Sequence, residues 1–325
     1  MRCLFSLLLL ALALHSFGQV TVEENKQKSF PNAIPPGNYS GVTWLGGDRY
    51  AVVSDKSEYD GFFFFEIKTD SVSGEVLSAR NLGFRSSGQP NRDGEGIAYN
   101  RRTNTIFISG EADNYIKEYD IDGRLTGRGI PPTNLYRQLP GNLGLEALSY
   151  NDSTRTLWTC NESDTIYIQS YNDSLQPIHT YKYILDTPIA DRGKAQFYAH
   201  GVGTICALDD GSLLLLEREF YVPYKKIGSF VNCKLYHFFP INPTSETGGK
   251  TSNVAKGQSQ VTKRLLASWR TSLNLTSRSI ANYEGMCVGP TLKDGSRVII
   301  LVADSQNQYR GVLKDWIKSL KLSFH

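Results

Sequence analysis

One short motif recurs five times in the 325-residue sequence and restricts the folds that the chain can adopt. Each copy begins with a polar residue at the start of an apolar strand. A turn and a second apolar strand follow, and the copy ends on another polar residue. The copies run from Ser40 to Asp55, Glu95 to Glu111, Glu146 to Glu162, His200 to Glu217 and Glu284 to Asp304. The first four begin roughly 50 to 55 residues apart, a period typical of supersecondary units that stack or close into a ring.

The turns within and between these copies favour strands over helices. Gly46-Gly47, Asp210-Gly211 and Asp294-Gly295 separate apolar segments, and such dipeptides are typical of β-hairpins. We therefore expect an all-β fold, a β-propeller built of antiparallel four-stranded sheets, with six blades or, as the alternative, five. The sixth would be a degenerate blade within residues 225–275, which would account for the longer gap before Glu284.

The N-terminal segment reads as an export signal. Arg2 supplies a positive charge, Leu4–Leu14 an apolar centre too short to span a bilayer, and Ser16–Gly18 a small-residue cleavage site. We expect a signal peptide at 1–18, an N-terminal tail at 19–37 and a single propeller domain at 38–325. The protein would then be secreted or periplasmic, monomeric and without a membrane span. Its formal net charge of +3 comes with no basic run, which argues against nucleic acid as a partner.

Aromatic residues and cysteines bear on the core. The run Phe62–Phe65 predicts a strand buried on both faces, as between two blades. Without the signal the chain keeps Cys160, Cys206, Cys233 and Cys287, which an exported protein can join in two disulfides. Cys206 and Cys233 would be the first pair to consider, and four buried thiols are the alternative.

The repeated acidic residues are the candidate site. Equivalent positions of propeller blades converge on the central channel, where clustered carboxylates must be neutralised by protons, basic groups or a cation. A hard oxygen-binding ion such as Ca²⁺ suits such a cluster, and carboxylates can also act as general bases. The metal candidates are Asp55, Glu95, Glu111, Glu146, Glu217, Glu284 and Asp304, and the catalytic candidates are Glu95, Glu146, Glu284, His200 and Arg218. Alternatively, acidic residues at strand ends bind turn amides or pair with Lys and Arg.

As an ordered set, these motifs resemble the family described as the esterase-like domain of phytase, a group of exported bacterial propeller proteins. The resemblance rests on Asp93–Ala98 with Ser109–Glu111, Gly144–Leu148, and Tyr283–Met286 with Asp304, together with Ser40–Val42 and Ser54–Asp55 in the first copy. It covers residues 38 to 322. It implies a hydrolase-like propeller that acts on carboxylic or phosphoric esters.

Three functions are consistent with this reading. The first is a calcium-assisted esterase or phosphoesterase that acts on a small-molecule ester or phosphoester at the central channel. The second is a non-catalytic propeller that binds an envelope or carbohydrate ligand and holds calcium for stability. The third is a lactonase-type hydrolase with the same central arrangement. Fold alone does not choose among them, because propellers serve both catalysis and binding.

Overall fold

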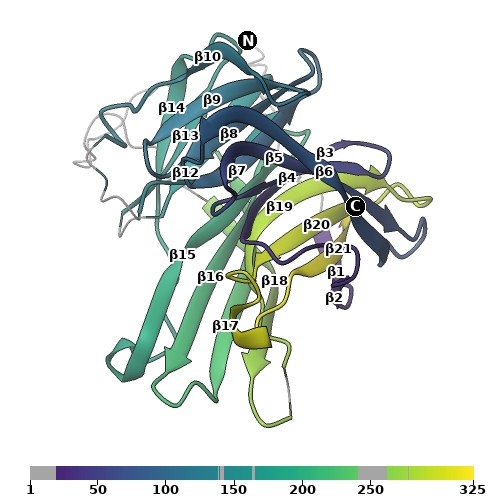
Figure 1. Cartoon of the computed structure of the whole chain (residues 1–325), viewed down its shortest axis with the longest axis vertical. Coiled ribbons are helices and arrows are strands. Elements are labelled where there is room, and N and C mark those ends of the chain that lie inside the picture. The colour runs from purple at the N-terminus through teal and green to yellow at the C-terminus, as the bar shows by residue number, and fades with distance from the viewer. Residues whose placement is uncertain (1–19, 138, 140–142, 163–164, 241–261, 277) are drawn as a thin grey trace, which may run out of the picture.

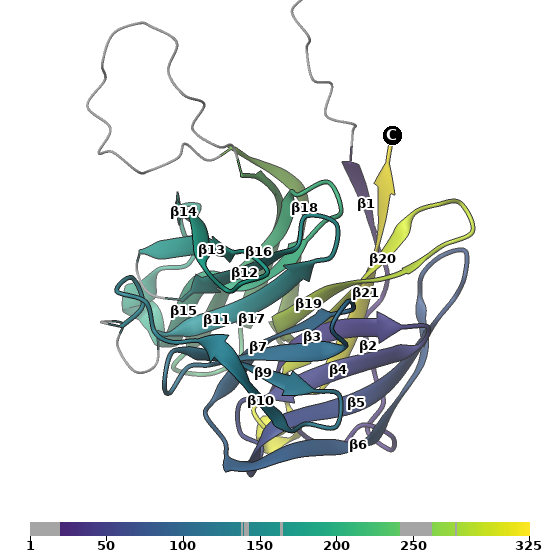
Figure 2. The same ribbon diagram turned by 90° about the horizontal axis from the view of Figure 1, so that it is seen from above.

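The strands form five antiparallel sheets set around one axis, as the two perpendicular views of Figures 1 and 2 show. The computed structural model describes residues 20–137, 139, 143–162, 165–240, 262–276 and 278–325. Within those ranges the chain is all-β apart from two short 3₁₀ turns, and the predicted β-propeller is confirmed. The same ranges contain no helix that is both long and apolar enough to cross a membrane. The expected signal peptide lies outside them.

Each sheet is one blade, and its first strand lines the axis in all five blades. Blade one comprises β3 (Tyr39–Gly46), β4 (Arg49–Ser54), β5 (Tyr59–Thr69) and β6 (Val76–Pro90). Blade two comprises β7 (Gly94–Asn100), β8 (Thr105–Gly110), β9 (Tyr115–Asp120) and β10 (Leu125–Ile130). Blade three comprises β11 (Leu145–Asn151), β12 (Thr156–Asn161), β13 (Ile166–Tyr171) and β14 (Pro177–Tyr183). Blade four comprises β15 (Ala195–Ala207), β16 (Leu213–Pro223), β17 (Ser229–Phe239) and β18 (Thr262–Leu273), and blade five begins with β19 (Asn282–Thr291) and β20 (Arg297–Asp304).

The described residues thus form five sheets, as in the five-blade alternative, and the degenerate blade expected within 225–275 is replaced by β17 and β18. These two strands complete blade four, whose strands are 11 to 13 residues long. The sheet therefore extends well beyond the ring (Figure 1), and this length accounts for much of the gap in the repeat. The predicted loop at 241–260 lies outside the described residues.

Blade five is completed by both ends of the chain. β21 (Trp316–Phe324) pairs with β20 on one side and with β1 (Val20–Glu24) on the other. The short β2 (Lys28–Ser29) also pairs with β21. The predicted C-terminal strand is therefore present but is not the outermost one, and part of the expected N-terminal tail is sheet. Backbone hydrogen bonds between the two ends close the ring.

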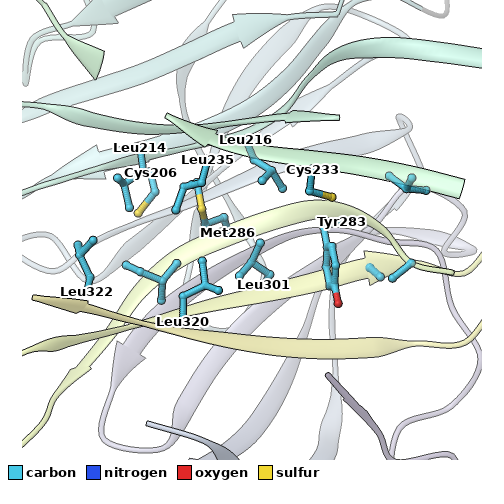
Figure 3. Close-up of a cluster of buried hydrophobic side chains, with 14 of the residues drawn as sticks. Cys206, Leu214, Leu216, Cys233, Leu235, Tyr283, Met286, Leu301, Leu320 and Leu322 are labelled. Carbon is cyan, nitrogen blue, oxygen red and sulfur yellow. The ribbon is translucent and has the colours of Figure 1, made fainter. Parts of the chain in front are cut away.

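Apolar side chains fill the spaces between neighbouring blades. Phe62 and Phe64 pack against blade two, whereas Phe65 packs against blade five, so the prediction for this run is confirmed. Figure 3 shows one of these interfaces, where Leu214, Leu216 and Leu235 of blade four meet residues of blade five. Each blade is thus covered on both faces by its neighbours, which fixes the position of its inner strand.

The cysteines are buried thiols, which was the alternative to two disulfides. Cys160, Cys206, Cys233 and Cys287 are all free and buried. Cys206 pairs in register with Leu214, whereas Cys233 pairs with Arg218, four residues further along β16. The first disulfide considered is therefore not formed, because these residues are held apart along the sheet.

All five inner strands carry a β-bulge at the same level. The register shifts by one residue at Ser40, Glu95–Gly96, Glu146, Gly203 and Glu284. A bulge re-aims the side chain of the extra residue and is common beside active sites. The bulges therefore direct five equivalent positions toward the axis.

We predict that Gly96→Ala destabilises the protein by about 3 kcal/mol, the upper end of the cost of overpacking. A Cβ at Gly96 would lie 2.4 Å from the backbone nitrogen of Leu148 in blade three, and a backbone atom cannot yield as a flexible side chain does. Gly193→Ala is the control, because Gly193 is exposed, has no positive φ, and its added Cβ would lie 3.2 Å from Oδ1 of the exposed Asp191 side chain. Urea denaturation of both variants measures the difference, and equal losses would contradict close packing of the inner strands.

Candidate functional site

One end of the axis is lined by buried carboxylates. Glu95, Glu146 and Glu284 reach it from the bulges of β7, β11 and β19. The ends of the second strands add Asp55, Glu111, Glu162 and Asp304 from blades one, two, three and five. The convergence predicted from the repeat therefore holds for most of the candidate positions.

Arg218 of β16 lies among these carboxylates and is almost fully buried. Its Nη2 is 2.8 Å from Glu162 Oε1, 3.0 Å from Glu284 Oε1 and 3.3 Å from Glu146 Oε1. Blade four has Gly203 at its bulge, and a Cβ there would lie 2.8 Å from Arg218 Nε. Because Gly203 has no side chain, blade four has room for the guanidinium group of Arg218.

Two sequence-predicted residues lie away from this centre. His200 was aligned with the glutamates, but the bulge of blade four is at Gly203, three residues later. Burial lowers the pKa of His200, and the charged groups near it include Glu219, Glu217 and Lys234 rather than the axial glutamates. Among the described residues no hydrogen bond or ion pair links His200 to the central carboxylates.

Glu217 belongs to a separate cluster on the other face of β16. Successive residues of a strand point to opposite faces, so Glu217 points away from the side that carries Arg218. Its carboxylate accepts hydrogen bonds from Tyr183 Oη at 2.7 Å and from Lys263 Nζ at 2.6 Å, and Lys263 also pairs with Asp186. Glu217 is therefore satisfied by local partners and is not a ligand of the axial site.

The three bulge glutamates have strongly perturbed pKa values. Burial raises the pKa of Glu95 well above its usual range, and the nearby Glu146 and Glu284 carboxylates raise it further. The pKa values of Glu146 and Glu284 are also well raised, mainly by burial, although Arg218 opposes the rise in both. Like charges close together in a site of low polarity favour protonated acids. One cation does not balance this group.

The acids at the ends of the second strands also have too few positive charges near them to balance their own. Burial raises the pKa of Asp304 to about 7, and the Asp55 carboxylate adds to the rise. Asp55 Oδ2 lies 3.1 Å from Lys56 Nζ, but Asp55 Oδ1 is buried with no hydrogen-bond partner. Asn282 Oδ1, on the strand paired with Asp304, is likewise buried and without a donor.

A possible cation position lies on the blade-three side of the centre. Glu111, Glu146 and Glu162 each offer an oxygen within 4.8 Å of the others. Glu162 was not among the candidate ligands, yet it follows Glu146 at the same spacing as Glu111 follows Glu95. Converging carboxylate oxygens fit the coordination preferences of Ca²⁺.

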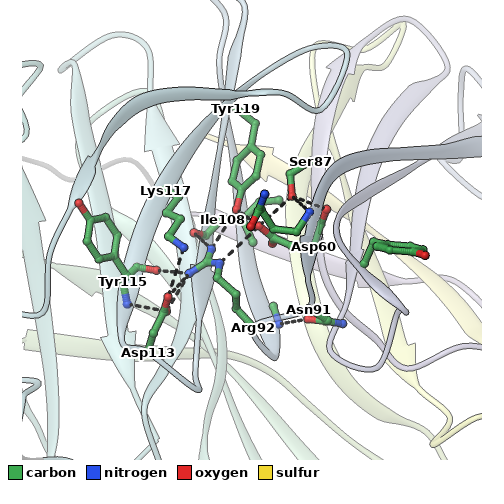
Figure 4. Close-up of polar contacts among 12 residues, drawn as sticks. Asp60, Ser87, Asn91, Arg92, Ile108, Asp113, Tyr115, Lys117 and Tyr119 are labelled. Atoms are coloured by element: carbon green, nitrogen blue, oxygen red, sulfur yellow. Dashed lines mark hydrogen bonds and ion pairs between the residues drawn. The ribbon is translucent and has the colours of Figure 1, made fainter.

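A polar network between blades one and two supports the centre. Arg92 Nη2 donates to Tyr119 Oη at 3.0 Å, and Arg92 Nε lies 3.5 Å from Asp60 Oδ2 (Figure 4). The adjacent Asn91 Nδ2 donates to the backbone carbonyl of Asp55 at 3.0 Å. Residues just before β7 therefore hold the Asp55 loop against the strand that carries Glu95.

We predict that stability falls as pH rises when divalent cations are absent. Asp304 loses its proton near pH 7 in the folded state but near its usual value of 3.8 when unfolded. Between these values the folded state binds more protons, so the free energy of unfolding decreases with rising pH. The melting temperature, measured in EDTA from pH 4.5 to 8, should fall. Asp304→Asn should flatten the slope, whereas the exposed Asp122→Asn should not; the reverse pattern would exclude a proton held at the axis.

We predict a large loss of stability for Arg218→Met at pH 7.5, about 3–5 kcal/mol, because buried carboxylates then lose their partner. The loss should be smaller at pH 4.5, where more of the glutamates are protonated. Arg80→Met is the control, since Arg80 also binds a glutamate but is exposed to water, so a much smaller loss is expected. Chemical denaturation at both pH values tests this, and equal losses for the two variants would contradict it.

Solved structures of similar shape include hydrazine synthase of Kuenenia stuttgartiensis, with 9% identity, a TM-score of 0.40, and 86% of this chain and 80% of that one covered. Streptogramin B lyase has 14% identity and a TM-score of 0.40, with 94% and 98% covered. The WD40 β-propeller domain of Doa1 has 10% identity and a TM-score of 0.37, with 92% and 96% covered. The search of curated proteins gives no match.

The sequence itself gives a more specific result. Residues 34–306 match the phytase-like family, described as "esterase-like activity of phytase". The matched range includes all five bulge positions and every carboxylate of the axial centre. The chain therefore belongs to the phytase-like family.

Proposed function

We propose that the protein is a hydrolase of carboxylic esters, acting at the carboxylate-lined end of the channel with the help of a divalent cation, of which Ca²⁺ is the candidate. The observation that carries the proposal is the convergence of Glu111, Glu146 and Glu162 oxygens within 4.8 Å, beside glutamates with raised pKa values. Perturbed acids gathered in one place are typical of catalytic sites. The family description supports ester chemistry.

The three clustered carboxylates, Glu111, Glu146 and Glu162, would hold the cation. When bound, such an ion polarises an ester carbonyl and orients water. A cation would also supply the positive charge that Arg218 alone does not.

Glu95 is the candidate for proton transfer. It lies on the axis, and its carboxyl makes no hydrogen bond or ion pair with a described residue, unlike Glu146 and Glu284, which contact Arg218. Its raised pKa favours the protonated acid, which can donate its proton to the departing alcohol oxygen, and the attacking water returns a proton to the carboxylate. Arg218 acts through its neighbours: by binding Glu162 and Glu284 it keeps their carboxylates in place.

The charge of the site favours a neutral ester over a phosphoric ester. The cations close to the axial carboxylates among the described residues are Arg218 and Lys56. A phosphate group carries negative charge and is usually recognised by clustered Arg and Lys donors. A carboxylic ester or a lactone carries none and meets no such repulsion.

A second function is favoured by the contacts of Arg218. This residue of blade four binds Glu146 and Glu162 of blade three and Glu284 of blade five, so the same cluster can serve to join blades. In that case the protein would be a binding propeller with a structural cation. A cation would then raise the melting temperature without any turnover.

We predict calcium-dependent hydrolysis of nitrophenyl carboxylic esters, loss of turnover in EDTA, and little activity on nitrophenyl phosphate. On an ethyl ester, whose departing alkoxide needs a proton, Glu95→Gln should reduce kcat by at least about 10²-fold, as expected when a general acid is removed, without a fall in melting temperature. Glu66→Gln, an acid on the outer side of blade one, is the control and should retain full activity. Turnover that survives both Glu95→Gln and EDTA would refute the mechanism, and no turnover with calcium-dependent stability would favour the binding propeller.

A further inference from the structure

A cavity of about 430 Å³ opens between the extended end of blade four and the turn that follows β20. Its apolar lining includes Phe197, Phe220, Val222, Ile280, Val312 and Leu313. Phe197 is 46% exposed, and Tyr309 at the edge is 43% exposed. Cavities of this size and character commonly bind small molecules. We call it the blade-four cavity.

The strands lead directly from the axial centre into this cavity. Arg218, Phe220 and Val222 alternate along β16 and share one face, and the pairing of β16 with β17 contains no register shift. Phe220 therefore lies about 7 Å beyond Arg218, the length of two strand residues. On the blade-five side Gln306, which also lines the cavity, donates its backbone N–H to Asp304 Oδ1 at 2.7 Å. The cavity and the carboxylate cluster are thus neighbours on the same face of the propeller.

The edge of the blade-four cavity is positively charged, whereas the axial carboxylate centre is negatively charged. Lys226 Nζ donates to Tyr309 Oη at 3.3 Å, and Arg310 lies 5.4 Å from the centre of the same ring. These cations hold the Tyr309 ring beside the opening. The described lining contains no carboxylate, so an apolar group placed there meets none of the negative charge of the axis.

We propose that the blade-four cavity binds the acyl chain of the substrate, so that the preferred esters are those of medium-chain, apolar acids. This inference rests on the proposed function, since it places the ester group at the axial carboxylates and its chain along the Phe220 side of β16. A short acyl group would leave the cavity filled with water. Each buried methylene contributes at most about fourfold to kcat/KM, the equivalent of ~0.8 kcal/mol.

The test is the rate of hydrolysis of nitrophenyl acetate, butyrate and octanoate. We expect kcat/KM to rise at least tenfold from acetate to octanoate in the unaltered protein. Phe197→Asp, which places a charge at the half-exposed edge, should lower the octanoate-to-acetate ratio at least tenfold. Tyr224→Asp is the control, because Tyr224 is exposed near the same tip but does not line the cavity, and it should keep the ratio.

The outcomes separate this inference from the proposed function. Hydrolysis without a chain-length preference would overturn the acyl cavity and leave the esterase proposal standing. If no ester is hydrolysed, the esterase proposal fails, and calorimetric titration with octanamide and acetamide, which are neutral, decides about the cavity. Octanamide binding at least tenfold tighter than acetamide binding, weakened by Phe197→Asp, would support an apolar-chain site, whereas equal affinities would overturn it.

Discussion

The unequal balance of buried charge at the axis is the constraint on which the rest of the centre depends. Three glutamates from inner strands and four acids from second strands gather at one end of the axis, where the nearby cations are Arg218 and Lys56. Removing carboxylates from water is costly unless they are paired, protonated or bound to a cation. Arg218 meets part of this cost by contacting Glu146, Glu162 and Glu284 at once. The cost that Arg218 does not offset is seen in the raised pKa values of the carboxylates and in buried oxygens that have no hydrogen-bond donor.

This concentration of charge is possible because the ring around it is rigid. Apolar clusters fill the spaces between blades, so the inner strands cannot move apart to relieve repulsion. The bulges then aim one residue per blade at the axis, and blade four differs by offering Gly203 in place of an acid. The bulges and the buried charges therefore lie at one level of the five inner strands. A site of this kind holds its groups in a reactive state at the expense of stability.

Much of this arrangement was predictable from the sequence. Strand pairs that recur with a polar residue at each end predicted the propeller, and they predicted that Glu95, Glu146 and Glu284 would meet. In blade four the repeat predicts that the polar His200 lies at the axis, whereas the equivalent position is Gly203, which looks like an ordinary turn residue in the sequence. The one-residue offset between Glu217 and Arg218 decides which face of β16 each occupies, and the bulge that sets it is not visible in the pattern. The unusual length of blade four also concealed the number of sheets.

The pairing of β1 with β21 brings together Val20 and Phe324, which are 304 positions apart. Such a contact requires almost the whole chain to be ordered first, because the entropy of closing so long a loop is repaid late. Folding is therefore expected to proceed blade by blade from local hairpins, with the seam between the chain ends formed last. Until then one edge of β21 presents unpaired backbone groups, the feature through which sheet proteins associate wrongly. The pairing of β1 with β21 stabilises the finished ring. Until this pairing forms, nearly complete molecules keep an open sheet edge and are most exposed to aggregation.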